Sequence, residues 1–504
     1  MGLQTVHVRV NDAATKLPTP VRLRITGPDG VSFPPFGHPW LIPVGPYECL
    51  GNNLRFGTAR YSLINGACEI QLPTQVPLEV EILKGPEFRP IRTTVTLNQG
   101  QMALRFVIER ISDLRSEGWL AGDGRVHGFS PHEAHLQAQA EDVAIVNLLA
   151  TATMHASMDG HCYETIPQMA AYSGQQPALA GDGAWVAVNT FQQHPMLGQV
   201  ALLHTHRAVF PLVFGGMDAT DDWSIVDWCE QAHRKRGLTV WCDAFRQDRG
   251  LMGGECLLAA LRGEIDAFEF DHSERPMAWL SAWYRLLNLG VTLPLVGSSA
   301  KRSNGEALGG MRTYARIAPD AEPGVPAWIE AVRAGRTWIT NGPLLRVTIG
   351  GSGPGETIPR TAISADGMLP ATIRLQSLVP VQALEILADG EAVQRIEVPE
   401  LADGQPFDWQ GEIPAGQASW FSVRTYGAAK SLLQPTSAVF AHTSPIGLAE
   451  PTWAKRAAAV PAVVRMLERL IDWSETEGRY SEARWKEQLV GYSQFAIRKL
   501  QANS

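Results

Sequence analysis

The stretch Gly118-Trp-Leu-Ala-Gly-Asp-Gly-Arg-Val-His127 decides the fold that we expect for this chain. It begins as a short apolar strand and ends in polar side chains. A helix is expected directly after it, because Ser130-Pro131 is a favourable N-cap and N1 pair. The next apolar run, Val143–Leu149, predicts a second strand. A strand, a helix and another strand in this order predict a parallel sheet.

Similar units continue to about residue 345. Ser224 and Asp227 have the spacing of a capping box, so a helix is expected from Ser224 to about Lys235, ended by Gly237. Apolar runs predict further strands at Leu238–Cys242, Ile265–Phe270 and Leu293–Val296. Helices are expected at Glu255–Arg262, Pro276–Asn288 and Ala327–Ala334. The repetition predicts a parallel sheet that is either open or closed into a barrel.

The flanking sequence has a different pattern. Residues 1–112 and 346–445 alternate apolar and polar side chains at period two, which is typical of β-sandwich strands. Val6, Val8 and Val10, for example, are expected on one face. Residues 446–504 have apolar residues at helical spacing and predict a pair of helices. Four domains are therefore expected, with the α/β domain at residues 113–345.

Composition limits the classes of protein to consider. The chain has 504 residues, of which 45% are hydrophobic and 19% charged, as expected of a globular protein with a large core. A net charge of -8 argues against nucleic acid as a partner, and no apolar run predicts a membrane span. The six cysteines form no C-x-x-C pair and are interpreted as reduced thiols, so a cytoplasmic protein is expected. The sequence leaves open whether the chain forms a homo-oligomer.

Candidate site residues follow the expected strands. In a barrel of parallel strands, residues just past the strand ends converge on one pocket. Polar side chains stand at several of these positions, and many of the histidines fall within the same segment. The candidates are Asp123, Arg125, His127, His194, Gln199, Asp243, Ser299 and Lys301.

Three motifs resemble one known family. Gly118–His127 resembles the "GW-x-GD-L-H-x-H" opening of CehA/McbA-type metallohydrolases, which belong to the PHP-like superfamily. Trp223–Phe245 is similar to the family's helix and following "A-H-P-F" strand, and Ile329–Leu345 to its "L-R-A-G-R-T-F-V-T-N-G-P" segment. The resemblance covers about residues 110–350.

The resemblance implies both a fold and an activity. The fold is a PHP-like distorted (β/α) barrel, here flanked by an N-terminal and a C-terminal β-sandwich and a C-terminal helical pair. The activity is metal-dependent hydrolysis of an ester, amide or phosphoester by a divalent ion such as Zn, Mn or Fe, which makes hydroxide available near neutral pH. The matching positions assign Asp123, His127 and Asp243 as metal ligands and catalytic residues.

Several positions depart from the family's motifs. Arg125 stands at the first histidine of H-x-H, and Gln199, Asp243 and Ser299 stand at other usual ligand positions. The family's glutamate falls near Asn189–Gln192, where there is no carboxylate. A guanidinium stays protonated and has no lone pair for a metal. The usual metal site is therefore expected to be lost or remodelled.

The departures leave several hypotheses open. In one, the chain is a non-catalytic relative that binds a small anionic or carbohydrate ligand, with Arg125 and Lys301 supplying positive charge and His194, Gln199 and Ser299 lining the site. In another, Arg125 only forms an internal salt bridge with Asp123 or Asp243. His204-x-His206 is an alternative metal pair, provided that both side chains share one face of a strand. The flanking sandwiches also fit an assembly module.

Overall fold

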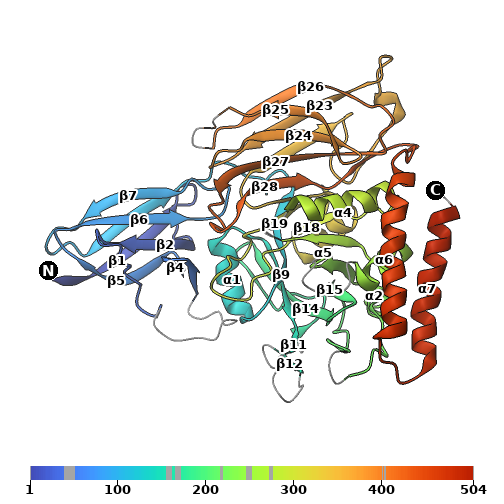
Figure 1. Cartoon of the computed structure of the whole chain (residues 1–504). Helices are drawn as coiled ribbons and strands as arrows, with labels where there is room; N and C mark the ends of the chain where they lie inside the picture. Colours follow the sequence, from blue (N-terminus) through green and yellow to red (C-terminus); the bar gives the residue numbers. More distant parts are fainter. Residues whose placement is uncertain are drawn as a thin grey trace.

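The computed structural model describes residues 2–38, 52–154, 162–164, 172–215, 219–245, 253–271, 276–399, 401 and 404–502. The chain is mostly β, with 39% of residues in strands and 21% in helices. Figure 1 shows an N-terminal group of strands at one end, a second group of strands above the centre, and the two C-terminal helices standing side by side at the opposite end.

Two sheets form the N-terminal region. One has the order β5-β1-β8 and the other β3-β4-β2-β6-β7. The alternation expected from the sequence buries Val6, Val8 and Val10 completely between these sheets. The strands are β1 (Leu3–Asp12), β2 (Val21–Thr26), β3 (Asn53–Phe56), β4 (Ala59–Ile64), β5 (Ala67–Pro73), β6 (Pro77–Leu83), β7 (Ile91–Thr96) and β8 (Ala103–Ile108).

A 16-stranded sheet dominates the rest of the molecule, with the order β18-β17-β16-β15-β14-β10-β9-β19-β20-β28-β27-β24-β25 along its main path. Its first half contains β9 (Trp119–Val126), β10 (Ile145–Ala150), β13 (Leu179–Gly181), β14 (Ala184–His194), β15 (Gly198–Leu203), β16 (Leu238–Cys242), β17 (Ala267–Phe270) and β18 (Leu295–Gly297). Its second half contains β19 (Arg312–Arg316), β20 (Thr337–Thr340), β22 (Thr357–Ile358), β24 (Ala383–Ala388), β25 (Glu391–Glu397), β27 (Trp420–Lys430), β28 (Ala438–Thr443) and β29 (Ile446–Leu448).

Two small sheets and seven α-helices complete the described structure. The sheets are β11 (Ala152–Met154) with β12 (Cys162–Glu164), and β21 (Leu344–Ile349), β23 (Met368–Gln376) and β26 (Phe407–Pro414). The helices are α1 (Pro131–Ala140), α2 (Ile225–Arg234), α3 (Gly254–Arg262), α4 (Pro276–Asn288), α5 (Val325–Arg333), α6 (Arg456–Thr476) and α7 (Ala483–Ala502), with one short 3-10 helix at Arg360–Ala362. None of the described helices is both long enough and apolar enough to span a membrane.

The large sheet curls until its β18 edge meets β19 and β20. The contact is made by hydroxyl groups, since Gly297 N donates to Thr313 Oγ1 at 2.7 Å and Thr337 Oγ1 donates to the Leu295 carbonyl at 2.9 Å. Leu120, Phe191 and Val240 from three of its strands lie in one buried cluster with Trp328 of α5. The curl therefore brings the ends of distant strands toward one another.

The expectation of a PHP-like distorted (β/α) barrel with a separate C-terminal sandwich is wrong, whereas the two-sheet N-terminal region and the C-terminal helical pair are present. The structure is mostly β, and the sheet continues without interruption from β18 to β25, across the boundary expected at residue 345. Parallel order is also broken, because β15 is antiparallel to both β14 and β16, and β19 is antiparallel to β9. Apolar runs mark buried strands, but they do not specify which strands pair.

Local signals in the sequence were more reliable. Ser130 caps α1 in a complete capping box with Glu133, as the Ser130-Pro131 pair indicated. Ser224 accepts a hydrogen bond from Asp227 N at the start of α2, but the reciprocal carboxylate is Glu255, which accepts from Ser224 Oγ at 2.5 Å and from Ile225 N at 3.0 Å. Because Glu255 lies on α3, spacing within the sequence of α2 could not predict this part of the cap.

Candidate functional site

The strand ends bring a buried group of three charges together. Arg125 on β9 donates from Nε to Glu269 Oε1 at 2.7 Å and from Nη2 to Glu269 Oε2 at 2.9 Å. Its Nη1 and Nη2 also lie 3.5 and 3.4 Å from the carboxylate oxygens of Asp243. The side chains of all three are at most 5% exposed. These carboxylates raise the pKa of Arg125 against the opposing effect of burial, so the guanidinium is charged.

Phe191 on β14 joins this charge group to His127. The Arg125 Cζ lies 5.1 Å from the centre of the phenyl ring, and the His127 ring centre lies 5.2 Å from it. His127 Nδ1 is 3.1 Å from the carbonyl oxygen of Leu149, which only accepts, so Nδ1 carries the proton and Nε2 has the free lone pair. Burial and the charges of Arg302 and Arg125 lower the pKa of His127, which keeps the ring neutral.

Asp123 has a separate environment, although it is only two residues before Arg125. The ladder between β9 and β10 shifts register after Asp123, which is the mark of a β-bulge. Asp123 Oδ1 accepts from the backbone N–H groups of Ser299 and Arg125, and Oδ2 accepts from Ser299 Oγ at 2.5 Å and from Gly309 N at 2.7 Å. Burial raises the pKa of this carboxyl group to about 6.

Ser299 and Lys301, two further candidates, already have hydrogen-bond partners within the protein. Ser299 Oγ donates to Asp123, and Lys301 Nζ donates to the carbonyl oxygens of Ser303 and Glu306 at 2.7 and 2.6 Å. The Lys301 side chain thus stabilises its own loop. Its charge is not directed at Arg125, so the two cations do not form the paired anion site that the sequence predicted.

His194 lies apart from the charge group. Its Nε2 is 2.9 Å from Asp221 Oδ1, and its Nδ1 accepts from the backbone N–H groups of Met196 and Leu197. Asp221 in turn accepts from the backbone N–H of Arg479, between α6 and α7. His194 therefore connects the β14–β15 turn to the C-terminal helices and has no lone pair left for a ligand.

Gln199 lies on β15, between Gln193 of β14 and Cys242 of β16. Asp243 follows Cys242 directly, so Gln199 lies beside the charge group. Its Oε1 is buried and has no hydrogen-bond partner among the described residues, and the same is true of His127 Nε2. Two buried acceptors without donors thus lie near Arg125.

The other histidine pair does not form the expected site. β15 ends at Leu203, and His204 has a left-handed φ of 56°. His206 is exposed, and its Nδ1 lies 3.2 Å from the Lys235 carbonyl oxygen. The two residues therefore lie beyond the strand, and their side chains do not share one face of it. Three further histidines of this segment, His155, His161 and His272, lie outside the described residues.

The donor set does not fit a divalent metal. The four donors on Asp123 leave its oxygens no lone pair for an ion, and Asp243 and Glu269 face the positively charged Arg125. His127 Nε2 is the single nitrogen ligand left in this group. Over the described part of the chain, no three His, Cys, Asp or Glu side chains are placed to hold a metal ion.

Sequence reasoning noted Glu269 at the end of its strand but did not select it as a site residue, and it missed Phe191. Glu269 had a signal, since a charged residue inside the apolar strand Ala267–Phe270 needs a buried partner. Phe191 had none, because its role depends on the pairing of β14 with β10, which in turn pairs with β9. The resemblance to CehA/McbA proteins stays a prediction, because a scan of protein-family models, a search of curated proteins and a search of solved structures all found no match.

Proposed function

We propose that this chain is a metal-independent binding protein for a small, uncharged, polyhydroxylated molecule of the carbohydrate class. The observation that carries the proposal is the pair of buried, unpartnered acceptors, His127 Nε2 and Gln199 Oε1, beside the neutralised Arg125. An unsatisfied buried acceptor costs about 1–3 kcal/mol, so a ligand that donates to it binds favourably. Hydroxyl groups donate without bringing charge.

Charge balance supports a neutral ligand over an anion. Arg125 already faces two carboxylates, and Lys301 is directed at backbone carbonyls. An anion would add negative charge beside Asp243 and Glu269, whose carboxylates already face Arg125.

Hydrolysis with a bound metal receives no support from the side chains. The oxygens of Asp123 are engaged by four donors, and a neutral His127 with a lowered pKa is a weak base. Both atoms that we propose for binding are covered by protein, so a ligand reaches them only after neighbouring groups separate. We therefore expect association well below the typical 10⁵–10⁷ M⁻¹s⁻¹.

The test is titration calorimetry with neutral mono- and disaccharides, compared with phosphate and citrate, on protein treated with a chelator. We expect at least one sugar to bind and the anions not to bind. Gln199→Met keeps the side-chain shape but removes the acceptor, and should weaken sugar binding at least tenfold.

Gln192→Met is the matched control. Gln192 is fully buried on β14, its amide donates to Thr190 Oγ1 and the Val209 carbonyl oxygen, and its Oε1 is also without a partner among the described residues, so this change removes a different buried acceptor and leaves Gln199 in place. It should leave sugar affinity unchanged. The proposal fails if no sugar binds, or if Gln199→Met binds as the wild type does. Stoichiometric Zn, Mn or Fe with metal-dependent ester or phosphoester turnover would favour the hydrolase hypothesis instead.

A further inference from the structure

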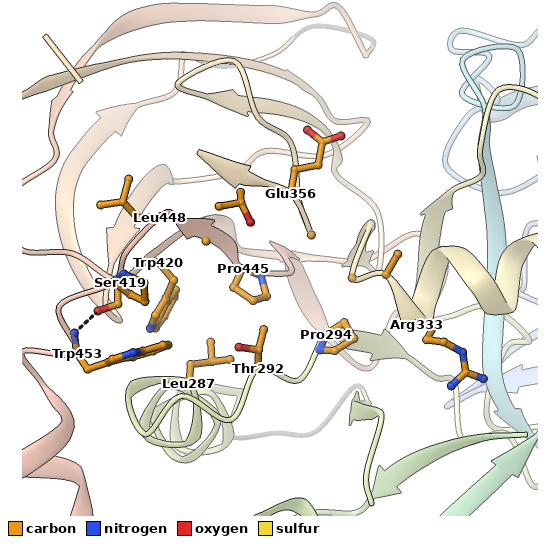
Figure 2. Close-up of a pocket in the computed structure, with 16 residues that line it drawn as sticks. Leu287, Thr292, Pro294, Arg333, Glu356, Ser419, Trp420, Pro445, Leu448 and Trp453 are labelled. Carbon is orange, nitrogen blue, oxygen red and sulfur yellow. Dashed lines mark hydrogen bonds between the residues drawn. The ribbon is translucent and has the colours of Figure 1, made fainter. Parts of the chain in front are cut away.

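A second site lies far along the chain from Arg125, in a cavity of about 270 Å³. Five stretches of the chain form it: the end of α4 with the loop to β18, the end of α5, the residues leading into β22, the start of β27, and the stretch from Pro445 through β29 to Trp453 before α6. Figure 2 shows the indole rings of Trp420 and Trp453 together at one end, with Pro445 and Pro294 toward the middle. The sequence assigned no function to any of these residues.

The two tryptophans are held in place from outside the cavity. Trp420 donates from Nε1 to Asn288 Oδ1 at 2.8 Å, and its ring packs against Tyr284 with ring centres 5.5 Å apart. Trp453 has a left-handed φ of 51° and donates from its backbone N to Ser419 Oγ at 2.9 Å. A non-glycine residue in this conformation costs on the order of 1–3 kcal/mol, and such strain is concentrated at ligand sites. The ring of Trp420 and the backbone of Trp453 are therefore fixed before any ligand arrives.

The two charged residues that line the cavity, Arg333 and Glu356, make their contacts with other parts of the protein. Arg333 donates from Nη2 to the Gly237 carbonyl oxygen at 3.0 Å, and its Nη1 lies 3.6 Å from Asp266 Oδ1. Glu356 Oε2 accepts from Gly353 N at 2.7 Å. In Figure 2 the guanidinium and the carboxylate both point away from the centre. A charged ligand would thus lose hydration without gaining a partner.

We propose that this cavity binds an uncharged, planar aromatic molecule of one or two rings. Its volume is just below the range of about 300–1,000 Å³ found for ligand pockets, which excludes larger ligands. The indole and proline ring faces offer stacking and edge contacts, worth about 0.5–1.5 kcal/mol for each aromatic pair beyond area burial. Thr292 and Thr357 are exposed at the rim, where their hydroxyl groups can bind one polar atom of the ligand.

Gly447 provides a sharp test of occupancy. A Cβ at this position would meet nothing closer than the Glu356 carbonyl oxygen and Thr357 Oγ1, both at 3.9 Å, and its φ is not left-handed. Gly447→Leu therefore fills the cavity without a backbone clash. The probes are indole, its anionic relative indole-3-acetate, and the saturated ring compound cyclohexanol, measured by titration calorimetry and saturation-transfer NMR on the full chain.

We expect indole to bind at least tenfold more tightly than indole-3-acetate or cyclohexanol. Gly447→Leu should abolish indole binding, and Trp453→Leu should weaken it at least tenfold. The matched control is Trp485→Leu, because Trp485 is a half-buried tryptophan on α7 that contacts Arg484. This substitution should leave indole affinity unchanged. Thermal unfolding of each variant establishes that it is folded.

Two results would overturn the proposal: no indole binding to the wild type, or indole binding that persists in Gly447→Leu. Equal binding of the three probes would show unspecific adsorption and would also overturn it. The outcome is independent of the sugar site, since Gly447→Leu should leave sugar affinity unchanged and Gln199→Met should leave indole affinity unchanged.

Discussion

The Arg125 group and the Trp420–Trp453 cavity are two regions of one sheet with opposite character. The first is polar and buried, and the second is lined largely by apolar and aromatic side chains. Around Arg125 the charges are buried and compensate one another, and two acceptors remain without donors. In the cavity the charges point outward, and the ring faces border open space. The difference teaches that the buried charges around Arg125 hold strand ends together, whereas the open space of the second site is bordered by aromatic rings.

Removing the cation should give the largest effect. Arg125→Leu removes the buried counter-charge of Glu269, a change that typically costs about 3–5 kcal/mol of unfolding free energy. Urea denaturation measures the loss. The control is Arg374→Leu, which breaks the exposed pair with Asp408 and should cost far less. Equal losses in the two variants would contradict the view that the Arg125 group holds the strands together.

Asp123 should make stability depend on pH. Burial raises its pKa from 3.8 to about 6, so the folded chain keeps a proton that the unfolded chain has released. Between about pH 4 and pH 6, the unfolding free energy should therefore fall as pH rises, by at most about 1.4 kcal/mol per unit. Denaturation at half-unit pH steps measures this slope. Asp123→Asn should remove the contribution, whereas a change at the exposed Asp320 should not.

Two glycines in the cavity wall should respond in opposite ways. Gly355 has a φ of 78°, and a Cβ there would lie 2.3 Å from the backbone of Gly335. Gly355→Ala should cost roughly 2–3 kcal/mol through this clash and backbone strain. Thermal and urea unfolding measure it, and a variant as stable as the wild type would show that the wall moves apart easily.

Gly447→Leu should give the smallest change. Its Cβ has open space and an ordinary φ, and replacing a glycine in a compatible conformation stabilises proteins by about 0.4–1 kcal/mol. A small gain in urea midpoint is expected. A loss above about 1 kcal/mol would mean that the space is smaller than the structure indicates, and would call for Gly447→Ala in the binding test.

The sequence predicted local features well. The caps at Ser130 and Ser224 and the burial of Val6, Val8 and Val10 depend on neighbours within a few residues, and the structure has them. The salt bridge between Arg125 and Asp243 was one of the alternatives considered. Strand pairing was not predictable, because β20 pairs with β28 across a long connection that includes a different sheet.

The cavity could not have been found from the sequence at all. Trp453 precedes α6, Trp420 begins β27 and Pro294 precedes β18, and the sequence placed these residues in three different domains. Only the continuous sheet brings the segments together. Domain boundaries drawn from a change in periodicity therefore hid the site, because the periodicity changes within one sheet.

The pairing of β9 with β19 has a consequence for how the chain is made. Gly122 and Thr313 are partners in this ladder, yet the ribosome releases them far apart in time. β10 is synthesised early and covers one edge of β9, while the other edge waits unpaired until β19 emerges. An open strand edge invites pairing with other chains. We therefore expect this edge of β9 to stay open to wrong pairing while the residues between these two strands are synthesised.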